Sequence, residues 1–237
     1  MELADHRLPD DQLGPQIASG RDTAIHALGD DRVVRRAPDD RPFQLEAELM
    51  EHVRAAGYPV PEVHRVAPGE MVLQRIAGPT MLEDLGKRPW RAGTHARLLA
   101  ELHARLHRIP APDWLRPFPV EGGAVLHLDL HPANVILSPD GPVVIDWTNG
   151  ARGAAAADLA LTWIILGVFE SDDRGLMKVL IAVLRRFFLR SFLAACDRDA
   201  AAAALPAVAA YREQDRNIRP TELAGLRALV EKVAGVR

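Results

Sequence analysis

The chain has 237 residues, of which 48% are hydrophobic and 26% charged, proportions that exclude an intrinsically disordered chain and allow a sizeable core. Its net charge of −3 excludes a global basic field of the kind that attracts nucleic acid or an anionic membrane surface. The single cysteine, Cys196, excludes an internal disulfide framework, and the longest apolar stretch, residues 159–169, is about half the length of a membrane span. A cytoplasmic protein is expected.

The first third of the chain predicts a small antiparallel sheet with one helix. Residues 16–36 contain three β-favouring runs separated by turns at Gly20 and at Gly29–Asp31. Residues 43–57 predict a helix that ends at Gly57 and buries Phe43, Leu45, Leu49 and Val53. The segments PVPEVHRV (residues 59–66) and EMVLQRI (residues 70–76) predict two further strands.

The composition changes after Gly78, and most of the remaining chain predicts helices. Residues 94–109 form a strongly amphipathic pattern that ends at Pro110, and a long helix is expected over residues 175–197. A shorter helix is expected over residues 220–236, with Thr221 as its N-cap. The predicted fold is α+β, with an N-terminal sheet lobe over residues 1–77 and a helical C-terminal lobe over residues 78–237.

The segment HLDLHPANVILSPDGPVVIDW, residues 127–147, predicts a β-hairpin with polar side chains at one end. Two β-branched runs flank the turn sequence SPDGP, so Asn134, before the first strand, and Asp146, after the second, come to the same end. One carboxylate and one amide oxygen form a poor zinc site but suit Mg²⁺, which fills its shell with water and substrate phosphates. Asn134 and Asp146 are therefore predicted metal ligands.

A third polar side chain, Asp129, lies five residues before Asn134. A carboxylate near a metal–phosphate centre can accept a hydrogen bond from an incoming hydroxyl and orient it for attack. The spacing His-x-Asp-x-x-x-x-Asn followed by Asp is typical of enzymes that transfer phosphoryl groups.

This segment, followed by GAAAADLA (residues 153–160), resembles the aminoglycoside phosphotransferase family of small-molecule kinases. The resemblance implies a bilobal protein-kinase-like fold and transfer of the γ-phosphate of ATP, or GTP, to a hydroxyl of an antibiotic or metabolite. It also implies Mg²⁺ as cofactor, nucleotide and acceptor as the partners, and a monomer or weak homodimer. A catalytically inactive nucleotide-binding regulatory protein of the same fold is the alternative.

The resemblance also implies roles for individual residues. In the C-terminal lobe, Asp129 matches the catalytic base, His131 lies near the transferred phosphate, and Asn134 and Asp146 match the Mg²⁺ ligands. His127 and Asp158 match residues that support the loop. The nucleotide-binding residues implied in the N-terminal lobe are Gly20 in the nucleotide loop, Arg35 at the usual lysine position, its helix partner Glu46, and the hinge around Gln74 and Ile76.

Two residues depart from the family pattern, since Leu128 and Ala133 stand where glycines are usual. Both add bulk beside the phosphates and disfavour some backbone angles. The acidic residues Glu170, Asp172 and Asp173 could line a pocket for a cationic acceptor, although a solvated turn is the simpler interpretation.

His103 and His107 are four residues apart on one helical face, which is a metal-ligand spacing. The sequence offers no evident third ligand and lacks the glutamate of the zinc proteases. We therefore expect these histidines to pack near the catalytic loop. Arg36, which alternates with Arg35 along its strand, is expected to be exposed.

Overall fold

The computed structural model describes residues 1–19, 23–168, 175–214 and 220–235. The chain divides into two compact units, one of Met1–Pro79 with Ile136–Thr148 and one of Thr80–Val135 with Asn149–Arg237. Gly20, in the expected nucleotide loop, and the acidic residues Glu170, Asp172 and Asp173 lie outside the described residues. The division of the chain into a nucleotide-binding and a substrate-binding lobe stays a prediction.

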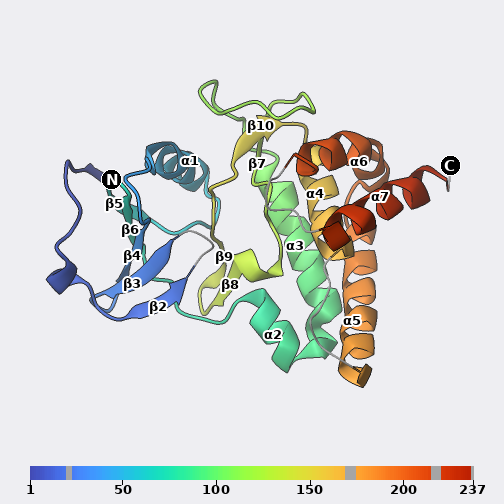
Figure 1. Cartoon of the computed structure of the whole chain (residues 1–237), viewed down its shortest axis with the longest axis horizontal. Helices are drawn as coiled ribbons and strands as arrows, with labels where there is room; N and C mark the ends of the chain where they lie inside the picture. Colours follow the sequence, from blue (N-terminus) through green and yellow to red (C-terminus); the bar gives the residue numbers. More distant parts are fainter. Residues whose placement is uncertain (20–22, 169–174, 215–219, 236–237) are drawn as a thin grey trace. The chain divides into compact units, whose positions relative to one another are not determined.

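The first unit contains a six-stranded sheet whose strand order is β1-β5-β6-β4-β3-β2 (Figure 1). Neighbouring strands are antiparallel except for the parallel pair β1–β5. The strands are β1 (Glu2–Leu3), β2 (Gln16–Ser19), β3 (Ala24–Leu28), β4 (Arg32–Arg36), β5 (Val63–Ala67) and β6 (Glu70–Gln74). This unit also holds the hairpin of β8 (Val135–Ser138) and β9 (Gly141–Val144), whose first residue, Val135, belongs to the second unit.

Helix α1 (Gln44–Ala55) is the predicted helix of the sheet unit, and it lies against β5. It buries Ala47, Leu49, Met50 and Val53. The prediction for Leu45 was wrong, because this side chain is 63% exposed. At about 100° per residue, the buried face formed by Ala47, Leu49, Met50 and Val53 is centred roughly 110° from Leu45, so Leu45 lies beyond its edge.

The expectation that Arg36 is exposed was also wrong. Its side chain is only 14% exposed and pairs with the fully buried carboxylate of Glu70 at 2.5 Å and with Asp10. Arg65 donates a second charged hydrogen bond to Glu70 at 2.8 Å. A buried carboxylate needs such partners, because burying an unpaired charge is costly. The N-terminal segment therefore packs onto the sheet through a charge network that alternation alone did not predict.

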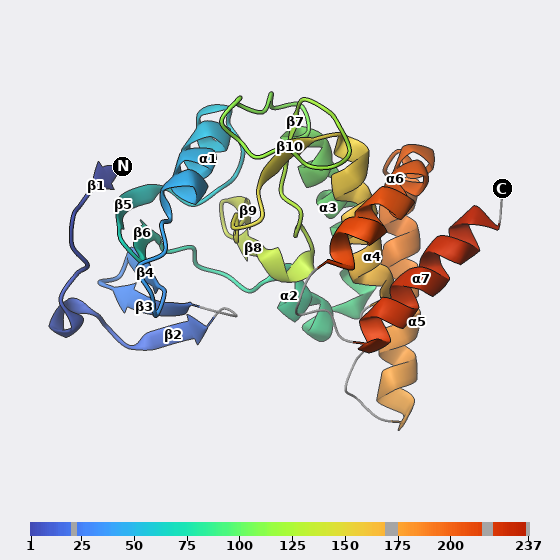
Figure 2. The ribbon, with the colours of Figure 1, turned by 45° about the horizontal axis from the view of Figure 1, so that its top comes forward.

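The second unit is mainly helical, as predicted (Figure 2). Its α-helices are α2 (Met81–Lys87), α3 (Ala92–Leu106), α4 (Ala155–Val168), α5 (Gly175–Ala194), α6 (Arg198–Arg212) and α7 (Pro220–Ala234). Helix α3 packs against α5, and α4 packs against α6 and α7. Two short strands, β7 (Ala124–Leu126) and β10 (Ala151–Gly153), form an antiparallel pair beside α4.

Two helix N-termini differ from the expectations drawn from the sequence. Thr80 and Glu83 form a capping box at the start of α2, an element that the sequence pattern did not predict. Helix α7 begins at Pro220, so Thr221 lies in the first turn and is not the N-cap. Proline is favoured at the first helical position, which explains the shift by one residue.

No helix within the described ranges is both long enough and apolar enough to cross a membrane. Helix α4 is the most apolar helix, and it is a core element whose residues from Ala157 to Ile164 are all buried. The expected buried helix is therefore confirmed over residues 159–164, residues 165–168 are half-buried, and Phe169 lies outside the described residues.

Gly78 fixes how the hairpin meets the end of β6 within the first unit. Its φ of 137° lies in a region that L-residues rarely adopt, and a Cβ there would come within 2.3 Å of the carbonyl oxygen of Leu137. The close approach accompanies a hydrogen bond from the Leu137 N–H to the Pro79 carbonyl at 2.8 Å. The backbone contact is therefore open only to glycine.

We expect Gly78→Ala to destabilise the protein more than Gly141→Ala. Gly141 has a similar φ of 127°, but a Cβ there would meet nothing within 4 Å. Both variants carry a backbone penalty of about 1–3 kcal/mol, and Gly78→Ala adds an overpacking penalty of about 1–3 kcal/mol. Urea unfolding curves of the two variants measure the difference. Equal losses of stability would show that the Leu137 carbonyl moves aside freely.

Candidate active site

In the first unit, Arg35 of β4 joins two carboxylates and a hydroxyl. Its guanidinium contacts Glu46 of α1 at 2.5 Å and Thr148 Oγ1 at 2.8 Å, and it lies 3.7 Å from Asp146 Oδ1. Thr148 donates to Asp146 Oδ1 at 2.9 Å. The structure therefore brings the predicted pair Arg35 and Glu46 together with Asp146, one of the predicted metal ligands.

The charges and the aromatic ring around Arg35 hold its guanidinium in one position. Burial raises the pKa of Glu46 above its ordinary value, the Arg35 charge opposes that rise, and the nearby carboxylate of Asp146 adds to it. Arg35 also lies over the ring of Phe43, with its guanidinium carbon 5.1 Å from the ring centre, an attractive cation–π geometry. Arginine thus presents a planar, multiply anchored cation, which suits phosphate oxygens.

Asp146 is held by the residues that surround it in the hairpin. It follows β9 in the left-handed conformation, with φ of 64°, which aspartate tolerates better than most residues. The next residue, Trp147, is 1% exposed, packs edge-on against Tyr58 and donates its indole N–H to the Val144 carbonyl at 3.1 Å. The buried indole fixes the turn, while 46% of the Asp146 side chain stays accessible.

The two predicted hinge residues differ in how their groups are used. The N–H of Gln74 donates to the Glu62 carbonyl at 2.9 Å, and its side-chain oxygen accepts the Glu62 N–H at 3.3 Å. Ile76 lies beyond β6 and is half-buried, and its N–H and C=O make no hydrogen bond within the part of the chain that the structure describes. Ile76 therefore has free backbone groups of the kind that can pair with a nucleobase.

In the second unit, Asp158 of α4 holds the backbone of the loop that carries Asp129. Its carboxylate accepts the N–H groups of His127 at 3.1 Å and of Leu128 at 2.8 Å. Leu128 has a φ of 60°, which costs roughly 1–2 kcal/mol for a residue with a Cβ. The departure from glycine seen in the sequence therefore falls at a left-handed backbone position, and Asp158 holds it there.

Three predicted site residues meet in this loop. The Asn134 side-chain amide donates to the Asp129 carbonyl at 2.9 Å and to Asp129 Oδ2 at 3.2 Å. His131 Nδ1 accepts the Ala133 N–H at 3.3 Å, so in the neutral ring the proton is on Nε2, which lies 3.4 Å from Asp129 Oδ1. Asp129 is thus held between a histidine and an amide.

This environment keeps Asp129 ionised. Burial alone would raise its pKa, but the hydrogen bond and charge of His131, the charge of His127 and the Asn134 amide together lower the pKa below its ordinary value. The side chain stays 30% exposed, so the carboxylate can still reach a ligand. An ionised, partly exposed carboxylate accepts hydrogen bonds, which suits orientation of a hydroxyl.

The oxygen donors of the two predicted metal ligands suit Mg²⁺. Because the Asn134 amide nitrogen donates to Asp129, its Oδ1 is the atom left for a cation. Thr148 and Arg35 engage Oδ1 of Asp146, which leaves Oδ2. Asn134 and Asp146 belong to different units, and their binding of one shared ion stays a prediction.

Two further histidines, His127 and His107, contact the loop or the Asp158 carboxylate that holds it. His127 is fully buried, and its Nδ1 accepts the Asp129 N–H at 3.2 Å. His107 contacts Asp158 at 3.0 Å, which confirms the expected packing near the catalytic loop.

The sequence analysis did not identify Thr148, which contacts both Arg35 and Asp146. The available signal was its position two residues after Asp146, directly after a buried tryptophan.

The chain matches the model of one protein family and resembles solved structures over nearly its whole length. The family model is that of the phosphotransferase enzyme family, matched over residues 14–123 and 113–196. A search of curated proteins finds no match.

The similar structures share the fold at low sequence identity. A choline/ethanolamine kinase family protein from Mesorhizobium loti has a TM-score of 0.60 and 17% identity, over 94% of this chain and 89% of that chain. A thermostable mutant of aminoglycoside phosphotransferase APH(4)-Ia, solved with AMP-PNP and hygromycin B, has a TM-score of 0.61 and 14% identity, over 94% and 93%. APH(2")-IIa, solved with streptomycin and ATP, has a TM-score of 0.58 and 15% identity, over 92% and 90%.

These structures confirm the expected α+β fold of the protein-kinase-like type. The match to the family model covers well over half of the chain and includes the loop and hairpin described above. The chain therefore belongs to the phosphotransferase enzyme family, and it is a small-molecule phosphotransferase whose acceptor group is a hydroxyl.

Proposed function

We propose that the protein transfers the γ-phosphoryl group of ATP, or of GTP, to a hydroxyl of a small molecule, with Mg²⁺ as the metal. The observation that carries this proposal is the Asp129 carboxylate, held ionised and partly exposed between His131 and the Asn134 amide. A positioned acceptor of this kind orients a hydroxyl and receives its proton as the bond to phosphorus forms.

The proposed roles of the other residues follow from their chemistry. Arg35, anchored by Glu46 and Thr148, is the cation for the nucleotide phosphates, and the backbone of Ile76 is the partner for the nucleobase. Mg²⁺, held by Asn134 and Asp146, would neutralise charge on the phosphates. His131 keeps Asp129 ionised and adds an N–H donor close to the same centre.

The acceptor belongs to the class of small alcohols. The similar structures suggest two subclasses to test first, aminoglycosides and amino alcohols. The solved relatives include proteins bound to streptomycin, gentamicin and hygromycin B and a member of the choline/ethanolamine kinase family. The three antibiotics, and choline and ethanolamine, are cationic molecules that carry hydroxyl groups. A phosphorylation screen with Mg²⁺-ATP and Mg²⁺-GTP against aminoglycosides, amino alcohols, macrolides and sugars identifies the acceptor.

We expect Asp129→Asn to lower kcat by roughly 10²–10⁴-fold with nearly unchanged nucleotide affinity, because the change removes the hydroxyl acceptor. Asp146→Asn should instead weaken binding of Mg²⁺-ATP, because it removes an anionic metal ligand. Asp140→Asn, at an exposed turn of the same hairpin, is the control and should change neither quantity. Steady-state kinetics and nucleotide titration measure both effects.

Two outcomes would contradict this assignment. An Asp129→Asn protein with full turnover would exclude Asp129 as the hydroxyl acceptor. Mg²⁺-ATP binding without turnover of any acceptor in the screen would favour the alternative of a non-catalytic nucleotide-binding protein.

We expect His131→Ala to move the acid limb of the kcat/KM profile to higher pH. The wild-type pKa of Asp129 is lowered, so its carboxylate persists as the pH falls and is lost only when the pH passes below that pKa. Removing His131 deletes the hydrogen bond that favours the ionised form, so protonation begins at higher pH. His64→Ala, a histidine outside the loop, is the control. Coincident acid limbs for His131→Ala and wild type would contradict the proposed role.

A further inference from the structure

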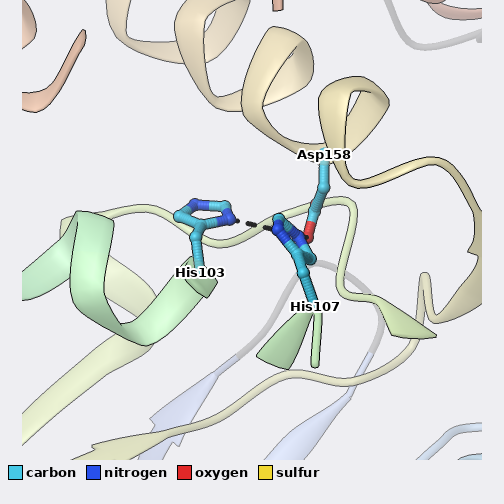
Figure 3. Close-up of side chains that lie close together, drawn as sticks. All are labelled: His103, His107 and Asp158. Atoms are coloured by element: carbon cyan, nitrogen blue, oxygen red, sulfur yellow. Dashed lines mark hydrogen bonds and ion pairs between the residues drawn. The ribbon is translucent and has the colours of Figure 1, made fainter. Parts of the chain in front are cut away.

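His103, His107 and Asp158 form a compact group of potential metal ligands in the second unit (Figure 3). Each contributes one ligand atom, and these atoms all lie within 4.8 Å of one another. His103 lies in the last turn of α3, His107 is the C-cap residue directly after that helix, and the carboxylate comes from α4. Asp158 is the third ligand that the sequence spacing of the histidines did not reveal.

The hydrogen bonds around His103 determine which of its nitrogens carries the proton. The Thr162 hydroxyl donates its single proton to the Leu130 carbonyl at 2.9 Å. Thr162 Oγ1 must therefore accept from His103 Nε2, which lies 3.1 Å away. In a neutral ring this leaves an unprotonated lone pair on Nδ1.

That lone pair faces a carboxylate in the protein interior. His103 Nδ1 is buried, makes no hydrogen bond among the described residues, and lies 3.6 Å from Asp158 Oδ2. Burial lowers the pKa of His103 and outweighs the opposite effect of the Asp158 charge. The lowered pKa favours the neutral ring. Two electron-rich atoms that face each other in a low-dielectric environment need a positive charge between them.

We propose that His103 Nδ1, His107 Nε2 and Asp158 Oδ2 bind a divalent transition-metal ion, with Zn²⁺ the best match. Two imidazoles and one carboxylate form a donor set that suits Zn²⁺ and its neighbours in the first transition series and does not suit Mg²⁺ or Ca²⁺. A solvent molecule would complete the four ligands of such an ion. Of the three side chains, His107 is the one with access to solvent, at 9% exposed.

The two distances from Asp158 Oδ2 to the histidine nitrogens are close to those that such an ion requires. Zinc bonds of about 2.0–2.1 Å at tetrahedral angles place ligand atoms about 3.3–3.4 Å apart. The two separations from Asp158 Oδ2 are 3.0 Å to His107 Nε2 and 3.6 Å to His103 Nδ1. Shifts of a few tenths of an ångström bring both to the required value.

The surroundings hold the ligands in orientation, as outer-shell groups do in known metal sites. The chain from His103 through Thr162 to the Leu130 carbonyl fixes one imidazole. The N–H groups of His127 and Leu128 fix the carboxylate. The ion is therefore structural and is independent of the metal proposed to accompany the nucleotide, because it uses none of the same residues.

The test uses the full chain without an affinity tag, treated with EDTA and then reloaded with ZnCl₂ or CoCl₂. We expect one metal ion per chain by elemental analysis and the visible absorption bands of four-coordinate Co²⁺. The melting temperature should rise by roughly 5–10 °C when free Zn²⁺ is about 100 times Kd.

The matched variants are His107→Gln and His95→Gln. His95 lies on the same helix and also pairs with a buried carboxylate, Asp84 at 2.8 Å, but that pair has no second histidine. We expect His107→Gln to lower Zn²⁺ affinity at least about 100-fold and to abolish the Co²⁺ bands, and His95→Gln to retain both. His103→Gln should behave as His107→Gln does, and circular dichroism checks that each variant folds.

Two results would overturn the proposal. One is a wild-type chain that binds no Zn²⁺ or Co²⁺ and has the same melting temperature in the presence of metal and of EDTA. That result would indicate that His103 carries a second proton in place of the ion. The other is metal binding that survives in His107→Gln. If a variant does not fold, the wild-type Co²⁺ spectrum decides, because six-coordinate, oxygen-only ligation excludes this site.

Discussion

The carboxylate of Asp158 accepts two backbone N–H groups from the loop that carries the reacting side chains, and it does so in the interior of the second unit. Burial raises the cost of ionising it, yet the neighbouring histidines His103 and His107 leave its pKa well below the ordinary value. The charged form is therefore the one that shapes the loop. Everything that Asp129 does depends on a backbone that this charge holds in place.

Arg35 has the corresponding place in the first unit. Helix α1 contributes one polar side chain, Glu46, to its guanidinium, and the segment after the hairpin contributes two, Asp146 and Thr148. Because arginine offers donors in a rigid fork, it can hold Glu46 and Thr148 at the same time and still present a cation to a ligand. Each unit thus organises its polar groups around one partly or fully buried charge, with opposite signs in the two units.

Much of the fold and part of the site could be predicted from the sequence. Most of the strands and helices follow from periodicity, and the spacing of Asp129, Asn134 and Asp146 predicts phosphoryl-transfer chemistry. Periodicity could not reveal that Arg36 turns inward, since that depends on Glu70, which lies 34 residues away. It also could not place Asp158 beside His103 and His107, because that contact depends on how α3 and α4 pack.

Leu128 combines a left-handed backbone with a side chain that is only 4% exposed. Burying a leucine contributes about 1.5–3 kcal/mol, which offsets the roughly 1–2 kcal/mol cost of its φ angle. A glycine at this position would let the loop change its backbone angles without disturbing the interior. With leucine, the loop can rearrange only if a core side chain leaves its place, so local opening of the catalytic loop becomes part of the cooperative unfolding of the unit.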